Sequence, residues 1–252
     1  MGPSHLGLAA SLGFAELPVT RRPRVAFFSN GDELRSLGDS IGLGDVYDSN
    51  RYTLYGMLAE DGAEMVDLGI VRDDPLAIRR AFLDAAGCAD MVITSAGASV
   101  GEADYVRDTL QELGAVTFWK VAIKPGRPLS FGTVGESLFF GLPGNPVSVM
   151  VTYELFVRRA LRRLCGEREG VPLVLQVPAA TDLKKRPGRK EYQRGILELD
   201  AAGRTVVRST GDQGSGILHS MSMANCYIIL PDESTGAVAG DLVEVRPFGS
   251  AI

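Results

Sequence analysis

Short apolar runs alternate with longer amphipathic stretches from residue 24 onward, and this alternation predicts an α/β domain. The short runs are rich in β-branched residues and predict strands at 24–29, 64–71, 89–94 and 115–123. The longer stretches repeat apolar residues at helical spacing and predict helices at 49–60, 75–86, 103–113 and 145–164. Two apolar runs within 129–140, separated by glycines, predict a hairpin before the last helix. The expected fold is a doubly wound sheet.

The pattern changes near residue 168, where short strand-like runs separated by Gly, Pro and Asp turns begin. These runs lie at 173–177, 191–199, 205–209, 225–230 and 242–246, and they predict a small β-barrel or sandwich. The first residues predict a short helix at 5–12 and a proline-marked connector, where something larger could be attached. We therefore expect a connector at 1–23, an α/β domain at 24–168 and a C-terminal β-domain at 169–252.

The composition is that of an ordinary globular protein. Of the 252 residues, 45% are hydrophobic and 23% charged, which excludes a disordered, collagen-like or disulfide-stapled chain. No apolar run approaches the roughly 18 residues needed to span a bilayer, and no signal-peptide pattern is visible, so we expect a cytoplasmic protein with no membrane partner. A net charge of −5 disfavours broad nucleic-acid binding. The three isolated cysteines are expected to be buried thiols.

Three glycine-rich loops, at 94–105, 124–129 and 141–148, are the most informative local feature. Two of them follow predicted strands and lead into predicted helices. Glycine allows close approach of the backbone to a ligand, and a helix N-terminus offers free N–H groups to an anion. The third loop places Asn145 at a helix cap and Pro146 in the first helical position, which also satisfies helix capping without any ligand. A phosphate-bearing ligand is the first hypothesis.

Acidic residues follow each of the first three predicted strands. They are Asp32, Glu33, Asp73, Asp74, Glu102 and Asp104. The carboxyl ends of parallel strands share one crevice, so these acids predict metal binding or acid–base chemistry around an anion. The alternative for each one is an acid that complements the dipole at a helix start.

Lys120 and Lys124 lie four residues apart at the end of the fourth predicted strand. An even spacing on a strand would put both side chains on one face, where they could neutralise an oxyanion together. The alternative is a solvated sheet edge guarded by lysines. In the β-rich part, the loops around Gly188, 193–195 and 211–216 have binding character, but taken alone they are better explained as turns.

Taken together, these motifs resemble the molybdopterin molybdenumtransferase family, which includes MoeA and the E domain of gephyrin, over about residues 6–248. The segments that carry the resemblance, with the family's order and spacing kept, are 31–34, 46–50, 72–75, 99–105, 119–131, 141–148 and 213–215. The resemblance implies a three-layer, MogA-like molybdopterin-binding α/β domain followed by a C-terminal β-barrel, in a homodimer. It implies insertion of molybdate into adenylylated molybdopterin with release of AMP, assisted by Mg²⁺.

The resemblance also implies roles for single residues. Glu33, Asp73 and Asp104 match the functional acids, with Asp73 and Asp104 as Mg²⁺ ligands, and Lys120 and Lys124 match anion-binding lysines. Arg194 and Ser215 match positions on the barrel side implicated in molybdate binding. The remaining positions expected to contact the pterin substrate are Ser95, Gly97, Ser99, Gly101, Gly144, Asn145 and Ser148.

The chain departs from the family pattern in two ways. The usual Ser-Gly-Gly is Ser95-Ala96-Gly97, and the usual threonine before Gly31 is Asn30. The family also carries an upstream linker and a lid domain that helps to complete the partner's site, so we expect this chain to be an excised fragment or a shortened paralogue. We expect it to fold and dimerise but to turn over poorly without them.

Two other functions compete with molybdenum insertion. One is a molybdopterin adenylyltransferase of the MogA/MoaB type, which the barrel and the Pro-Gly-Arg-Pro loop disfavour. The other is a binding or scaffold module without catalysis, for which no peptide groove is visible. An adenylyltransferase of the same pathway is a further expected partner.

Overall fold

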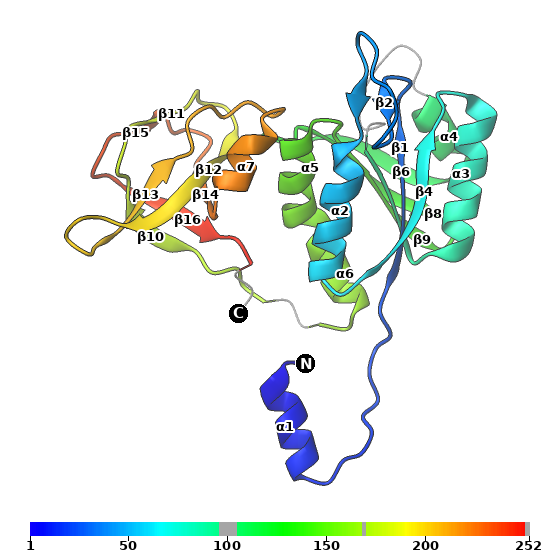
Figure 1. The fold of residues 1–252 in the computed structure, drawn as a ribbon, viewed down its shortest axis with the longest axis horizontal. Coiled ribbons are helices and arrows are strands. Elements are labelled where there is room, and N and C mark those ends of the chain that lie inside the picture. Colours follow the sequence, from blue (N-terminus) through cyan, green and yellow to red (C-terminus); the bar gives the residue numbers. More distant parts are fainter. Residues whose placement is uncertain (96–104, 168–169, 250–252) are drawn as a thin grey trace.

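The computed structural model of the chain describes residues 1–95, 105–167 and 170–249. An α/β part and a β-rich part lie side by side, and the short helix α1 (Pro3–Ser11) projects away from both (Figure 1). The main elements of the α/β part are β1 (Arg24–Asn30), α2 (Ser49–Glu60), β4 (Glu64–Val71), α3 (Pro75–Cys88), β5 (Met91–Ser95), α4 (Tyr105–Leu113), β6 (Gly114–Lys120), β8 (Pro128–Val134), β9 (Ser137–Leu142), α5 (Pro146–Thr152) and α6 (Arg158–Leu164). The short strands β2 (Leu34–Arg35) and β3 (Val46–Tyr47) pair with each other.

The central sheet has the strand order β4-β1-β5-β9-β8-β6. Strands β4, β1, β5 and β9 are parallel, whereas β8 is antiparallel to both of its neighbours. The predicted hairpin at 129–140 is β8 and β9, but its second strand lies inside the sheet next to β5. The predicted doubly wound architecture is confirmed.

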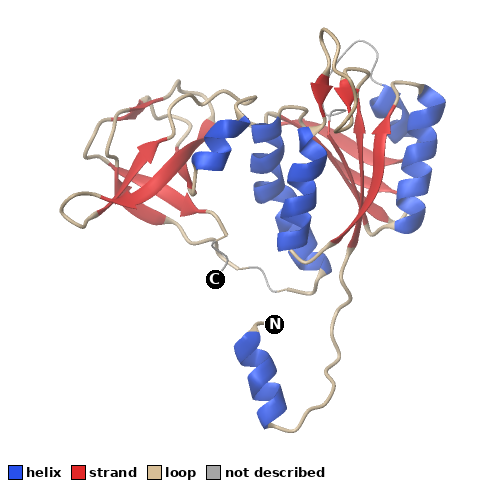
Figure 2. Ribbon diagram, viewed as in Figure 1, coloured by secondary structure: helices blue, strands red, loops and turns tan. Residues whose placement is uncertain are grey.

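Helices cover both faces of the sheet, which gives three layers (Figure 2). On one face, Val25 and Phe27 of β1 pack with residues of α2 and of the helix that starts at Pro146. On the other face, Ala26 and Phe28 pack with residues of α3 and α4. Successive residues of a strand point to opposite faces, so a strand covered on both sides reads as a continuous apolar run.

The long helix predicted at 145–164 is present as α5 and α6, but a π-helical turn at Tyr153–Val157 joins the two. A π turn inserts a residue and rotates the C-terminal part of the helix relative to the N-terminal part. Tyr153, Glu154 and Val157 are buried there. Apolar periodicity could not reveal this turn, because it is a local defect in an otherwise helical pattern.

The predicted strand 115–123 is wrong at its end. Strand β6 stops at Lys120, and a separate strand β7 (Ile123–Lys124) pairs in parallel with β12 of the β-rich part. The chain therefore leaves one sheet and joins the other within three residues. The β-propensity of these residues does not show which of the two sheets they join, since either sheet offers an extended strand to pair with.

The β-rich part is a small barrel. Its elements are β10 (Leu175–Pro178), β11 (Leu183–Lys184), β12 (Lys190–Leu199), β13 (Thr205–Ser209), α7 (Leu218–Met223), β14 (Cys226–Leu230), β15 (Gly236–Ala237) and β16 (Leu242–Pro247). The order β10-β16-β14-β12-β13 is antiparallel throughout, and a bridge between Ala179 and Val207 brings the two ends together. All five predicted strands are found, whereas α7 was not predicted.

An apolar cluster joins the barrel to the α/β part. Val147 and Val151 of α5 pack with Met221 of α7 and with Tyr227 and Ile229 of β14. All five are buried. The two parts are therefore held together by the same force that forms a core, the removal of apolar surface from water.

The N-terminal connector is held to the α/β part by Arg21, whose guanidinium donates hydrogen bonds to both carboxylate oxygens of Asp90. This contact lowers the pKa of Asp90, because the carboxylate accepts hydrogen bonds from a cation. Helix α1 buries no residue and leaves Leu6 and Leu8 exposed. None of the described helices is long and apolar enough to cross a membrane.

The cysteines differ from one another. Cys226 is buried, and burial raises the pKa of its thiol to about 12. Cys88 and Cys165 are only half-buried, so the prediction of three buried thiols is wrong for these two. Cys88 is the last residue of α3 and Cys165 follows α6, where the apolar periodicity stops.

Candidate functional site

The carboxyl ends of the parallel strands meet at one edge of the sheet. The segments that leave this edge are 31–33 after β1, 72–74 after β4 and 143–145 after β9. This arrangement is the crevice in which open α/β sheets bind ligands. The described acids, Asp32, Glu33, Asp73 and Asp74, therefore lie on the same edge as the third glycine loop, as predicted, whereas Glu102 lies outside the described residues. Gly97, Ser99, Gly101 and Asp104 were also expected here, but they lie outside the described residues.

Buried polar residues form the floor of this edge. The Ser29 hydroxyl donates to Asp48 Oδ2 at 2.7 Å and lies 3.2 Å from the Ser95 hydroxyl. The other oxygen of Asp48 accepts the backbone N–H of Arg51 and so caps α2. Ser95 is thus tied into the floor, at the point where β5 delivers the first glycine loop. The sequence motif at 46–50 contained Asp48, but nothing in it indicated a contact with Ser29.

A hollow that we call the sheet-edge hollow lies above this floor. Its lining includes Glu33, Asn50, Ser95, Gly144 and Asn145. Asn50 donates a hydrogen bond from Nδ2 to the carbonyl of Gly144 at 2.7 Å and so holds the third glycine loop in place. Of the predicted site residues, the structure brings Glu33 to the same hollow as Ser95 and the Gly144 loop.

A second hollow, the junction hollow, lies where the α/β part meets the barrel. Its lining comes from two segments of the α/β part, 124–128 and 143–148, and from two loops of the barrel. The residues are Lys124, Pro125, Gly126, Arg127, Pro128, Pro143, Gly144, Asn145, Ser148, Arg189, Asp212, Gln213, Gly214 and Ser215. Its volume of about 790 Å³ falls within the range of roughly 300–1,000 Å³ of small-molecule sites. It shares Gly144 and Asn145 with the sheet-edge hollow.

Three basic residues of the junction hollow, Lys124, Arg127 and Arg189, suit an anion. Lys124 Nζ lies 3.0 Å from Glu191 Oε1, and the Glu191 side chain is only 4% exposed, whereas that of Lys124 is 43% exposed. The lysine therefore neutralises a buried carboxylate while part of it remains accessible. Gly126 has a φ of +98°, and a Cβ there would come within 2.6 Å of Thr152 Cγ2, so only glycine lets this loop run against α5.

The start of α5 differs in detail from the predicted anion cradle. Asn145 is the N-cap residue, as predicted, but its side chain makes no capping hydrogen bond. One of the first backbone N–H groups, that of Val147, donates to the carbonyl of Ser215 in the barrel at 3.1 Å. The exposed Asn145 amide therefore faces the two hollows instead of stabilising the helix, and Ser215 of the barrel contacts the helix directly.

A third hollow, which we call the acid hollow, is lined by four aspartates and also by Arg35 and Arg72. Asp32 and Asp73 both contribute to it, and the backbone N–H of Asp73 donates to Asp32 Oδ1 at 3.4 Å. Asp74, which also lines it, accepts the N–H of Ala77 and is the N-cap of α3. For Asp74 the helix-start explanation is therefore correct. Among the described residues, no group of three or more His, Cys, Asp or Glu side chains could hold a metal ion.

The structure corrects the prediction that Lys120 and Lys124 share one face of one strand. Lys120 ends β6 and is exposed, whereas Lys124 belongs to β7 and pairs with the barrel. Only Lys124 lines the junction hollow. The physical reason is the exchange of pairing partners after residue 120, which interrupts the two-residue period on which the prediction rested.

Arg194 was expected to contact molybdate, but it lies outside the junction hollow. It is 1% exposed and does not line the junction hollow. Its guanidinium donates to the Ser220 hydroxyl and to the carbonyls of Asp212, Gln213 and Gly214. Burial lowers the pKa of Arg194. Arg194 thus supports the loop that carries Ser215 from behind, while Ser215 itself lines the hollow.

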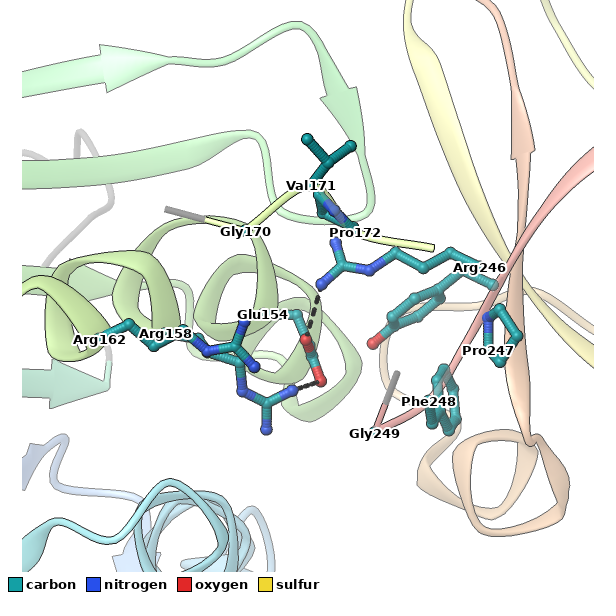
Figure 3. A pocket seen from close by; sticks show the side chains of 11 residues that line it. Glu154, Arg158, Arg162, Gly170, Val171, Pro172, Arg246, Pro247, Phe248 and Gly249 are labelled. Atoms are coloured by element: carbon teal, nitrogen blue, oxygen red, sulfur yellow. Dashed lines mark hydrogen bonds and ion pairs between the residues drawn. The ribbon is translucent and has the colours of Figure 1, made fainter. Parts of the chain in front are cut away.

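A further hollow lies at the other end of the domain interface, between the helix 153–164 and β16 (Figure 3). Arg158, Arg162 and Arg246 line it together with Glu154. The Glu154 carboxylate accepts hydrogen bonds from both Arg158 and Arg246, and Arg158 also pairs with Asp61 at 2.9 Å. These guanidinium charges are largely neutralised within the protein, so this hollow is a poorer anion site than the junction hollow.

Comparison with known proteins identifies both parts of the chain. Residues 29–163 match the family model described as a probable molybdopterin binding domain. Residues 176–248 match the model of the MoeA C-terminal region, domain IV.

Related proteins match almost the whole chain. It is 40% identical over 247 residues to a molybdopterin molybdenumtransferase of Haemophilus influenzae, and the alignment covers 98% of this chain and 61% of that protein. It is 34% identical over 286 residues to gephyrin of Dictyostelium discoideum, covering 99% of this chain and 40% of that protein. A crystal structure of a molybdopterin biosynthesis MoeA protein from Pyrococcus horikoshii superimposes with a TM-score of 0.83 at 28% identity, over 100% of this chain and 61% of that one. The chain thus spans about three fifths or less of the length of these relatives.

Proposed function

Since the chain belongs to the family of the probable molybdopterin binding domain, we propose that it acts in molybdenum cofactor biosynthesis, inserting molybdate into adenylylated molybdopterin with release of AMP. The observation that carries this proposal is the junction hollow, which loops of the molybdopterin-binding part and of the MoeA-type barrel build together. A binding domain without the barrel would lack the wall that Arg189 and residues 212–215 form.

The charges of the hollows suggest where each part of the substrates binds. The cations of the junction hollow, among them Lys124 of the strand that pairs with β12, suit molybdate or a phosphate, both of which are anions. The sheet-edge hollow adjoins it through Gly144 and Asn145 and contains no lysine or arginine in its lining among the described residues. We propose that the anionic groups lie in the junction hollow and that the uncharged pterin extends into the sheet-edge hollow, next to Glu33 and Ser95.

We propose that a magnesium ion binds at the acid hollow. Mg²⁺ prefers oxygen ligands and is usually held by one or two carboxylates, while waters and substrate phosphates complete its coordination. Asp32 and Asp73 offer hard oxygen donors at the sheet edge without a full protein cage. We propose Asp73 as one ligand and, from the family resemblance alone, Asp104 as the other. When bound, Mg²⁺ would stabilise negative charge on the phosphates as the adenylate is hydrolysed.

The residues of the chain have two tasks in this reaction. Lys124 and Arg127 would bind and orient the anion, and Asn145, whose amide is free of the helix cap, would hydrogen-bond it. Hydrolysis adds water across the phosphoric anhydride bond and yields AMP and the pterin phosphate. We propose Glu33, which lines the adjoining sheet-edge hollow, as the acid that accepts a proton in this reaction.

The test is a reaction of this chain with adenylylated molybdopterin and molybdate, measuring AMP release and the formation of molybdenum cofactor. Asp104→Ala should abolish the metal-dependent reaction and leave the melting temperature unchanged. Lys184→Ala is the matched control for variants of the site lysines, since Lys184 is exposed on the barrel and lines none of the three hollows of the site. Consumption of ATP and molybdopterin to form the adenylylated product would instead indicate an adenylyltransferase.

We also propose that the protein works as a cytoplasmic homodimer and receives adenylylated molybdopterin from the adenylyltransferase of the pathway. The support is the similarity to molybdopterin molybdenumtransferases. Sedimentation velocity of the chain measures the oligomeric state directly, and a purely monomeric species at micromolar concentration would contradict the proposed dimer.

A further inference from the structure

The width of the junction hollow depends on how the barrel sits against the α/β part. Gly144 and Asn145 line it from one side and Asp212 to Ser215 from the other. At this end, the hydrogen bond from the Val147 N–H to the Ser215 carbonyl and the pairing of β7 with β12 join the two parts. The interactions in the apolar cluster behind it are non-directional. They resist separation of the two parts better than they resist sliding of one part over the other. A directional contact farther away would be needed to fix the orientation.

Glu154 and Arg246 form such a contact, which we call the junction strap. Glu154 Oε2 accepts a hydrogen bond from the Arg246 guanidinium at 3.2 Å, and the two side chains are 10% and 17% exposed. Glu154 belongs to the π turn of the α/β part and Arg246 to β16 of the barrel. Figure 3 shows the carboxylate between the guanidinium groups of Arg158 and Arg246. The strap thus crosses the domain interface in a partly dry environment, where charge-assisted hydrogen bonds are strong and directional.

The α/β side of the strap is held rigidly. The second oxygen of Glu154 accepts a hydrogen bond from Arg158, which pairs with Asp61 at the end of α2. Tyr153, adjacent to Glu154, donates its hydroxyl proton to the same Asp61 at 2.7 Å, and its ring lies 5.7 Å from the Arg158 guanidinium. Arg246 is therefore tied, through Glu154, to two helices of the α/β part. A rigid anchor is what a positioning contact requires.

The π turn places this anchor. Asn145 and Glu154 belong to one continuous helical segment and lie nine residues apart, about 13 Å along a helix axis. The inserted residue of a π turn changes which direction the following side chains take, and such turns are frequent near functional sites. Glu154 lies in this turn and is buried where the turn contacts the barrel. This contact is at the end of the interface opposite the hydrogen bond of Val147. The same helix therefore carries the hollow at one end and the strap at the other.

We infer that Glu154 and Arg246 are positioning residues for the anion site, which set the placement of the barrel loop 212–215 over Gly144 and Asn145. The inference rests on the proposed function only for the identity of the anion. Neither residue lines the junction hollow. Breaking the strap should loosen the far end of the interface, let the barrel pivot on the apolar cluster and open the Val147 to Ser215 contact.

The test compares Glu154→Gln and Arg246→Gln with Arg162→Ala. Arg162 lines the same hollow in Figure 3, but its ion pair, with Glu167 at 3.9 Å, stays within the α/β part. The first readout is hydrogen exchange of the Val147 amide, which needs no ligand. The second is the affinity for molybdate, measured by calorimetry. Both strap variants should speed Val147 exchange and weaken molybdate binding by roughly threefold to tenfold, the usual size of coupling between distant sites.

Three further results decide the inference. The double variant should be no worse than Glu154→Gln alone, because Arg246→Gln removes only a contact that Glu154→Gln already breaks, and Arg246→Lys should restore most of the affinity. Wild-type exchange at Val147 in folded Glu154→Gln and Arg246→Gln, or an equal effect of Arg162→Ala, would overturn it. Should Glu154→Gln not fold, Arg246→Gln alone decides, since its partner carboxylate keeps Arg158. If the wild-type chain binds neither molybdate nor molybdopterin, the proposed function fails, whereas the exchange of Val147 still decides the role of the strap.

Discussion

At the scale of single residues, the two candidate lysines have different surroundings and should behave differently. Lys124→Ala leaves the buried Glu191 carboxylate without its cation, so we expect a loss of about 1–2 kcal/mol in the free energy of unfolding. The same change should weaken molybdate binding by about 1.5–3 kcal/mol, the contribution of one charge-assisted hydrogen bond. Denaturant unfolding and calorimetric titration measure the two effects.

Lys120→Ala is the matched comparison. Lys120 is exposed at the end of β6 and lines none of the described hollows, so its removal should change stability by less than about 0.5 kcal/mol. From the resemblance we still expect a loss of anion affinity. Equal affinity in wild type and Lys120→Ala would assign this lysine to a solvated sheet edge.

The Arg21 to Asp90 contact gives a pH prediction. The folded-state pKa of Asp90 is below its unfolded value, so the contact stabilises the fold above the unfolded pKa, and this stabilisation is lost as the pH falls through the folded pKa. Wild type should therefore lose stability more steeply than Asp90→Asn as the pH falls below about 4, the ordinary aspartate value. Melting temperatures from pH 7 to pH 2.5 measure this difference. Parallel curves for the two proteins would show that the contact contributes nothing.

At the scale of elements, the loop 212–215 depends on a residue outside the hollow. Arg194 satisfies three consecutive loop carbonyls, and a lysine has no planar fork with which to bond all three. Arg194→Lys should therefore loosen the loop and weaken molybdate binding about tenfold, with the barrel still folded. The control is Arg208→Lys in the neighbouring strand β13, where the arginine pairs with Glu198 at the surface. Unchanged molybdate affinity in Arg194→Lys would show that the loop keeps its shape without the guanidinium.

At the scale of the whole molecule, the apolar cluster between the two parts should make them unfold together. Met221 is 5% exposed and contributes to this cluster from α7. Met221→Ala should cost about 2–4 kcal/mol, as large-to-small substitutions in a core do. Calorimetry should show one transition for wild type and two for the variant, because the barrel would lose its support first. A single transition at the wild-type temperature in Met221→Ala would mean that the domains are coupled by other contacts.

The sequence predicted most elements of the α/β part correctly because their signals are local. The helix at 49–60 and the strand at 64–71 match the structure at both ends. Asp48 and Asp74 cap helices where capping rules expect acceptors. The topology in turn predicted where some site residues lie. Once the strands are known to be parallel, the segments after β1, β4 and β9 must share one edge of the sheet.

The tertiary structure alone decided how the two parts cooperate. Lys124 pairs with Glu191, 67 positions away, and Glu154 with Arg246, 92 positions away. Arg194 reaches the carbonyls of a loop about 20 residues farther on, and the turn at 211–216 thereby becomes one wall of a hollow. Periodicity and capping report only on neighbours within a few residues, and they fixed the strands, the helices and the edge to which the acids belong. Contacts between distant segments depend on how finished elements pack, since burial and charge pairing act through space and not along the chain.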